Sequence, residues 1–164
     1  MDSLPGAADE FEVLFRANYV RLVRALTLLA GSPEDAADAV QDAFVKAHLR
    51  WRTIRQYDDP MAWVRRVAIN GVRDQHRRSR RKQRAMETLS ADAMAAAPSN
   101  DAHDTALLEA IDALPRQQRA AIALYYLGGL SVSETAAALA VSEGAVKFHL
   151  HQGRERLRLT VGAE

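Results

Sequence analysis

The charged side chains of this sequence are gathered into segments of one sign, and these segments could bind charged partners. Nine Lys or Arg residues fall between Arg65 and Arg84, against one acid, Asp74, although the whole chain has a net charge of only +1. A basic block of this density suits polyanion binding, and nucleic acid is the commonest polyanion in a cytoplasm. A helix face that contacts only water would have a similar composition.

Aromatic residues come shortly before this basic block. Trp51, Tyr57 and Trp63 all precede Arg65. Rings interleaved with cations suit single-stranded or opened DNA, because bases stack on the rings. Packing in the protein core is the alternative for the two tryptophans. We favour core packing for Trp63 and leave both interpretations open for Trp51.

Three acids, Asp35, Asp38 and Asp42, are spaced by three and four residues, so they share one face of a helix. This face could be solvated, could dock on a basic partner, or could bind a divalent ion, although no companion ligands converge on it. His149 and His151 would point about 200° apart on a helix, so they cannot share one metal ion. The sequence has no cysteine and no nucleophile–base pattern, so we expect neither an enzyme nor a protein with a metal or cofactor.

Helix signals organise the first half of the chain. Apolar residues recur at helical spacing from Asp9 to Ala30, and Gly31 is a suitable end. Ser32 and Pro33 form a helix start, with a stripe of small and apolar residues that reaches Trp51. Asp59 can cap a third helix, which is predicted over 60–81.

The second half has a different pattern. Residues 90–102 lack large apolar side chains apart from Met94 and predict a linker. Two short helices follow, and Gly128-Gly129 ends the second. Ser131 and Glu134 form a capping box, and Ser142 caps a final helix that reaches about Arg158. No strand pattern appears. We predict an all-α protein of two small helical domains, 9–84 and 104–160, joined by a flexible linker at 85–103.

The last two predicted helices form a helix-turn-helix, whose second helix can enter the DNA major groove. On a helical wheel, Val146, Leu150 and Leu157 face the core. Phe148 and Gln152 lie opposite, where they can touch a thymine methyl group and an adenine edge. An exposed helix of an ordinary bundle is the alternative interpretation.

Several stretches together resemble the extracytoplasmic-function sigma factors of the sigma-70 family, and most closely their SigE-like branch. Residues 34–47 and Ala62-Trp-Val-Arg-Arg-Val-Ala-Ile-Asn70 look like region two. Ala113-Leu-Pro-Arg-Gln-Gln-Arg119 and the helix-turn-helix over 131–157 look like region four. The resemblance implies an alternative sigma factor that directs promoter recognition, DNA melting and transcription initiation, while the polymerase does the chemistry. It covers roughly Phe11 to Arg158.

The resemblance also implies partners. Core RNA polymerase would bind through its β′ coiled coil and β flap, and promoter DNA would bind both domains. Many family members are held inactive by an anti-sigma factor that clamps the two domains, so such a protein is a candidate partner. The residues that would face the β′ coiled coil are Asp38, Gln41 and Asp42.

Two sets of residues would contact promoter DNA. The set assigned to the melted minus-ten element is Trp51, Tyr57, Asp58, Met61, Arg65, Arg66, Asn70, Arg73 and Arg77. The set assigned to the duplex minus-thirty-five element is Ser142, Glu143, Gly144, Lys147, Phe148, His151, Gln152 and Arg154.

The final helix departs from the family pattern, because His149 and Gln152 stand where arginines are usual. Its Val-Lys-Phe-His-Leu run also matches LuxR-type regulators, so a stand-alone dimeric regulator is the alternative function. No heptad pattern supplies a dimer interface, and we expect a monomer when the protein is free.

No apolar run is long enough for a membrane span, and the N-terminus lacks a secretory pattern, so we expect a cytoplasmic protein without membrane contact.

Overall fold

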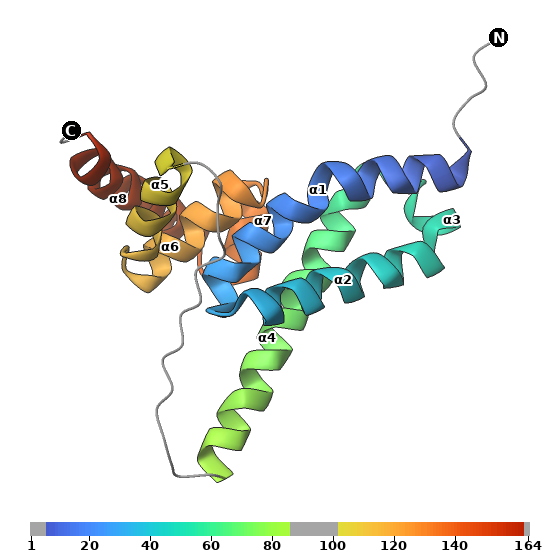
Figure 1. Ribbon diagram of the computed structural model, residues 1–164, viewed down its shortest axis with the longest axis horizontal. Helices are drawn as coiled ribbons and strands as arrows, with labels where there is room; N and C mark the ends of the chain where they lie inside the picture. The colour runs from blue at the N-terminus through green and yellow to red at the C-terminus, as the bar shows by residue number, and fades with distance from the viewer. Residues whose placement is uncertain (1–5, 86–101, 163–164) are drawn as a thin grey trace.

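The computed structural model describes residues 6–85 and 102–162, and every regular element in these two ranges is a helix (Figure 1). This confirms the predicted all-α fold. The predicted linker lies outside the described residues except at its ends, where one helix reaches Ala85 and the next begins at Ala102. Among the described helices, none is long and apolar enough to cross a membrane.

The first two helices, α1 (Ala7–Ala30) and α2 (Pro33–Leu49), meet at a tight corner. Gly31 takes the left-handed conformation with φ 74°, which a residue without Cβ adopts at little cost, and its N–H donates to the carbonyl of Thr27. Ser32 accepts a hydrogen bond from the N–H of Asp35 at 3.3 Å. Gly31 therefore ends α1 and Ser32 caps α2, as the sequence predicted.

The short helix α3 (Trp51–Ile54) leads through a loop into α4 (Pro60–Ala85). The carboxylate of Asp59 accepts a hydrogen bond from the N–H of Ala62 at 3.1 Å, which confirms it as the cap. The first half of α4 packs against α2, and the second half extends away from the rest of the molecule (Figure 1). Every residue from Arg77 to Ala85 is exposed.

The core of this N-terminal module, which we define as α1–α4, is rich in aromatic rings. Phe11 contacts Phe44 and Trp51 edge to face, with ring centroids 6.3 and 5.3 Å apart. The indole N–H of Trp51 donates to the carbonyl of Ala7 at 2.6 Å. The ring of Trp51 is thus buried with its one polar atom satisfied.

The C-terminal module comprises α5 (Ala102–Asp112), α6 (Arg116–Ile122), a π-helical turn η1 (Ala123–Leu127), α7 (Val132–Leu139) and α8 (Glu143–Val161). The predicted capping box is present in both directions: Glu134 N–H donates to Ser131 Oγ at 3.0 Å, and Ser131 N–H donates to Glu134 Oε1 at 3.1 Å. Ser142 Oγ accepts from the N–H of Ala145 at 3.1 Å. α7 and α8 form the expected helix-turn-helix.

The two modules pack against each other, a contact that sequence patterns did not predict. η1 lies along α1, and Leu124 and Leu130 belong to the same buried cluster as Leu26 and Ile69 of the N-terminal module. In the other direction, Leu28 of α1 packs against the core of the C-terminal module. Burial of apolar surface therefore holds the helix-turn-helix on the N-terminal module.

Candidate nucleic-acid and partner interfaces

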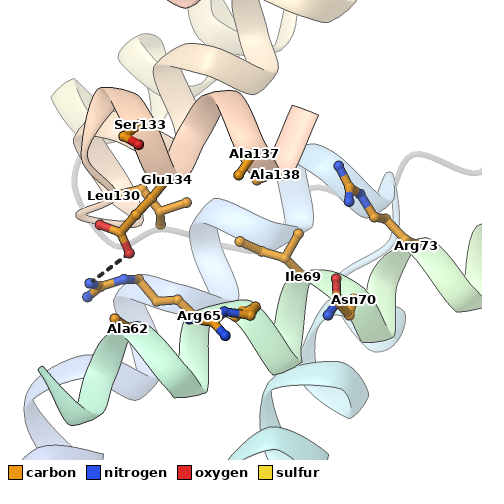
Figure 2. A pocket seen from close by; sticks show the side chains of 11 residues that line it. Ala62, Arg65, Ile69, Asn70, Arg73, Leu130, Ser133, Glu134, Ala137 and Ala138 are labelled. Carbon is orange, nitrogen blue, oxygen red and sulfur yellow. Dashed lines mark ion pairs between the residues drawn. The ribbon is translucent and has the colours of Figure 1, made fainter. Parts of the chain in front are cut away.

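A groove of about 430 Å³ separates α4 from α7 (Figure 2). One wall comes from the basic part of α4, and the other comes from the exposed side of α7. The α4 side chains that line it are Arg65, Arg66, Asn70 and Arg73, all of which were assigned to the minus-ten element. The groove therefore gathers four predicted DNA-binding side chains along one face of one helix.

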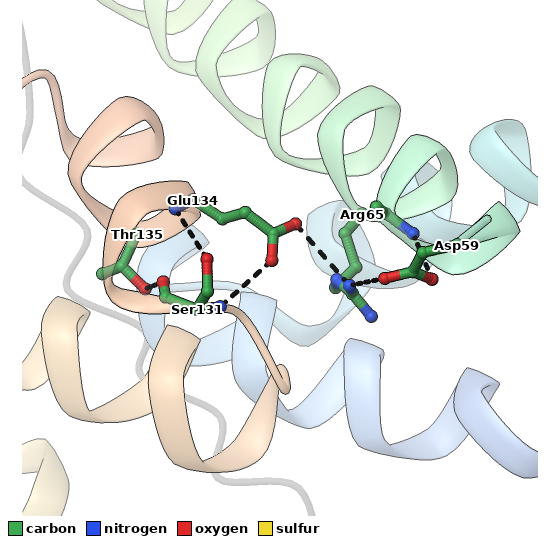
Figure 3. A network of polar contacts seen from close by, with 6 residues as sticks. Asp59, Arg65, Ser131, Glu134 and Thr135 are labelled. Atoms are coloured by element: carbon green, nitrogen blue, oxygen red, sulfur yellow. Dashed lines mark hydrogen bonds and ion pairs between the residues drawn. The ribbon is translucent and has the colours of Figure 1, made fainter. Parts of the chain in front are cut away.

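Arg65 occupies one end of this groove and is held by carboxylates from both modules (Figure 3). Its Nη2 atom lies 2.9 Å from Asp59 Oδ2 and 3.6 Å from Glu134 Oε2. The residue is only 9% exposed, and its Nε–H has no hydrogen-bond partner. In this conformation Arg65 is turned inward, toward acids, and does not face solvent.

The loop before α4 presents some of its predicted residues to solvent and buries others. Tyr57 is 46% exposed, and Asp58 is exposed beside it. Met61, in contrast, is 6% exposed and belongs to the core, as does Trp51 at 8%. Core packing leaves neither side chain exposed to DNA in this structure, and the minus-ten assignment of these two residues stays a prediction.

The polar side chains along α4 differ in their exposure to solvent. Arg66, Asn70 and Arg77 are exposed, and Arg73 is partly buried. Arg77 pairs with Asp74 at 3.2 Å, but both side chains are largely exposed, so this pair is weak and a phosphate can compete for Arg77. Arg66 and Arg77 are therefore open to a polyanion, whereas Arg65 and Arg73 are partly or wholly shielded in the groove.

The outer face of α2 carries the predicted acidic patch. Asp38, Gln41 and Asp42 are all exposed, and Asp42 pairs with Lys46 at 2.8 Å. Sequence reasoning missed the apolar part of this face: Val45 is 53% exposed and Leu49 is 78% exposed. Their spacing from Asp38 and Asp42 is helical, and this periodicity was the signal that could have identified them.

The second helix of the helix-turn-helix presents the predicted face to solvent. Phe148 is 59% exposed, while Val146 and Leu150 are buried beneath it. Gln152 is half-buried, and Arg154 donates to the hydroxyl of Tyr126 at 3.1 Å. The remaining assigned residues are all exposed: Ser142, Glu143, Gly144, Lys147 and His151.

No group of three or more His, Asp or Glu side chains among the described residues could hold a metal ion. The acids of α2 and the two histidines of α8 therefore form no metal site in that part of the chain.

Comparison with known proteins identifies both modules. Residues 14–82 match the family model described as Sigma-70 region 2, and residues 104–157 match Sigma-70, region 4. The RNA polymerase sigma-E factor of Streptomyces coelicolor is 33% identical over 93% of this chain and 86% of its own length. The ECF RNA polymerase sigma factor SigM of Mycobacterium tuberculosis is also 33% identical, over 96% of this chain and 80% of its own length. The chain belongs to the extracytoplasmic-function sigma factors.

Solved structures share the fold of this sigma factor. The sigma factor RpoE of Bartonella quintana, crystallised with the anti-sigma factor NepR, superimposes with a TM-score of 0.74. The two chains are 22% identical, and the match covers 94% of this chain and 98% of that one. CnrH, solved in complex with the cytosolic domain of CnrY, matches with a TM-score of 0.53 at 26% identity.

Membership in this family establishes the function in outline. This protein is an alternative sigma factor that directs transcription initiation. The family matches do not favour a stand-alone LuxR-like regulator. Sequence reasoning missed Glu134 as a residue that contacts the predicted DNA surface, since its capping-box pattern indicated only a helix start.

Proposed function

We propose that this sigma factor docks on core RNA polymerase through the outer face of α2. The observation that carries this proposal is the exposure of Asp38, Gln41 and Asp42 beside two exposed apolar side chains, Val45 and Leu49. A face with acids at its centre and apolar residues at one end suits a basic partner helix, because charge steers the encounter and apolar burial adds affinity.

Promoter DNA would bind along α4 and along α8. Tyr57 and Asp58 stand at the exposed loop before α4, where an unpaired base can stack on the tyrosine ring. The arginines of α4 would hold the phosphates of the melted strand. Phe148 and Gln152 of α8 would read base edges of the duplex minus-thirty-five element, and Lys147 would contact phosphate.

The boundaries that we propose for these roles are 9–84 for polymerase and minus-ten binding, 85–103 for the linker, and 104–160 for minus-thirty-five binding. The sigma factor itself would catalyse nothing, would need no cofactor, and would act as a monomer in the cytoplasm. The neighbours solved in complex with NepR and with the cytosolic domain of CnrY support an anti-sigma partner for this chain as well.

Run-off transcription with purified core polymerase on a randomised promoter pool tests the proposal. We expect initiation that requires this protein, and sequencing of the transcribed templates would reveal both recognition elements. Retained binding to free duplex DNA without any initiation would count against the assigned roles.

Reversing the charge of Asp38 or Asp42 to Lys should reduce core binding at least ten-fold, roughly the effect of placing a cation against a basic partner surface. The change should leave the fold intact, because both side chains are exposed. A pull-down with core polymerase measures the effect. Glu12→Lys on the exposed side of α1 is the matched control and should bind core normally.

A further inference from the structure

We infer that the C-terminal module closes over α4 in the free sigma factor and masks part of its minus-ten surface, with Glu134 as the latch on Arg65. This inference rests on the proposed role of α4 in DNA binding. It concerns contacts within one chain and needs no second protein.

Glu134 performs two tasks with one carboxylate (Figure 3). Its Oε1 atom accepts from the N–H of Ser131 at 3.1 Å and so caps α7. Its Oε2 atom lies 3.6 Å from Arg65 Nη2, in the other module. The cap therefore fixes the second oxygen in place opposite α4, and the contact costs little extra side-chain entropy.

The latch does not act alone, because apolar burial supports it. Leu130, just before the capping box, is 4% exposed and is buried in the cluster that contains Ile69 of α4. Ala138 and Leu139 of α7 pack against the same cluster. The closed arrangement is thus a packed interface with an ion pair at its edge.

Closure and DNA binding compete for the same atoms. Arg65 directs its Nη2 atom at Asp59 and Glu134 and is only 9% exposed, so little of its guanidinium is open to a phosphate in this arrangement. Asn70 and Arg73 lie further along the same groove, with Ala137 of α7 lining its opposite side (Figure 2). A DNA strand that contacts Arg65 must displace α7, and the fraction of open molecules then limits the apparent affinity.

Glu134→Gln removes the ion pair with Arg65 and keeps the helix cap. Glutamine at this position still accepts the hydrogen bond from Ser131, because capping boxes use Glu or Gln, but it has no charge for Arg65. Glu109→Gln is the matched control: it removes one negative charge from an exposed position of α5 in the same module. Ala137→Lys is a second route to opening, since it places a cation opposite the arginines of α4.

The distance between modules is the first measurement. The chain has no native cysteine, so Ala17→Cys on α1 and Ala113→Cys after α5, both exposed positions, take spin labels without background. Pulsed electron resonance on the full chain should show one short distance in the parent and longer, broader distances in Glu134→Gln and Ala137→Lys. Glu109→Gln should match the parent.

Affinity for single-stranded DNA is the second measurement. The probe is a fluorescent oligonucleotide with the non-template strand of a promoter recovered by run-off selection. Glu134→Gln should bind it about three- to ten-fold more tightly than Glu109→Gln, as expected when the open fraction rises by that factor. Arg66→Ala in the Glu134→Gln background should reverse the gain if α4 binds the strand.

The outcomes distinguish a failure of the closure from a failure of the proposed DNA-binding role of α4. A long, broad distance in the parent would overturn closure, and unchanged short distances in both opening variants would overturn the role of Glu134 as the latch, whatever the DNA result. Longer distances without any gain in DNA affinity would overturn masking. Longer distances and tighter binding that Arg66→Ala leaves untouched would show that α4 is not the masked surface, so the proposed DNA role of α4 would fail while closure stands.

Discussion

At the scale of single residues, Gly153 of α8 packs closely against α6. This glycine is buried where α8 crosses α6, and a Cβ atom there would lie 2.9 Å from Ile122 Cγ1. Ile122 is itself 2% exposed, so its side chain has little space in which to move. The position therefore requires a residue without a side chain.

Gly153→Ala should destabilise the protein by about 1–3 kcal/mol, the usual cost of overpacking a core. Gly144→Ala, on the exposed first turn of the same helix, should be neutral or stabilise by up to about 1 kcal/mol, because its Cβ would meet nothing closer than 3.9 Å. Urea unfolding of the two variants beside the parent measures both changes. Equal effects of the two substitutions would contradict the packing argument.

Phe148 is the residue whose exposure most directly supports base reading. Phe148→Ala should change which sequences bind the minus-thirty-five site, and the salt dependence of binding should stay the same, since no phosphate contact is lost. Lys147→Ala should leave the sequence preference unchanged and reduce the slope of log affinity against log salt by about 0.9. Binding to a duplex library at several salt concentrations separates the two. A change only in salt slope for Phe148→Ala would show that the ring reads no base.

At the scale of elements, a serine hydroxyl caps the start of each helix in the helix-turn-helix. Ser131 caps α7 and Ser142 caps α8, and Ala140 between the helices takes the left-handed conformation at φ 55°. A non-glycine residue in that conformation stores strain, which the two capped helices must offset. The stability of α7 and α8 therefore depends on both serines.

Ser131→Ala and Ser142→Ala should each cost about 0.5–2 kcal/mol of stability, the usual loss for removing a helix cap. Thermal unfolding followed by circular dichroism measures this loss. Ser133→Ala, at an exposed position inside α7, is the control and should change stability little. An equal loss in the control would mean that the caps are not the cause.

At the scale of the whole molecule, the two modules form one packed body through Leu124, Leu130 and Leu28. In the proposed function each module reaches its own promoter element, so the modules would have to separate on the polymerase. Separation would expose Leu124 and Leu130 and break the ion pair between Glu134 and Arg65.

Local signals in the sequence determined the helices, their caps and the exposed faces of α2 and α8. These features depend on residues a few positions apart, so spacing alone reports them. Family resemblance added the roles of those faces. Tertiary structure alone decided which candidate side chains are available: Trp51 and Met61 are buried in the core, and Arg65 is held by Glu134 from the other module. Such contacts join residues far apart in the chain, and they depend on how the helices pack, which periodicity along the sequence cannot specify.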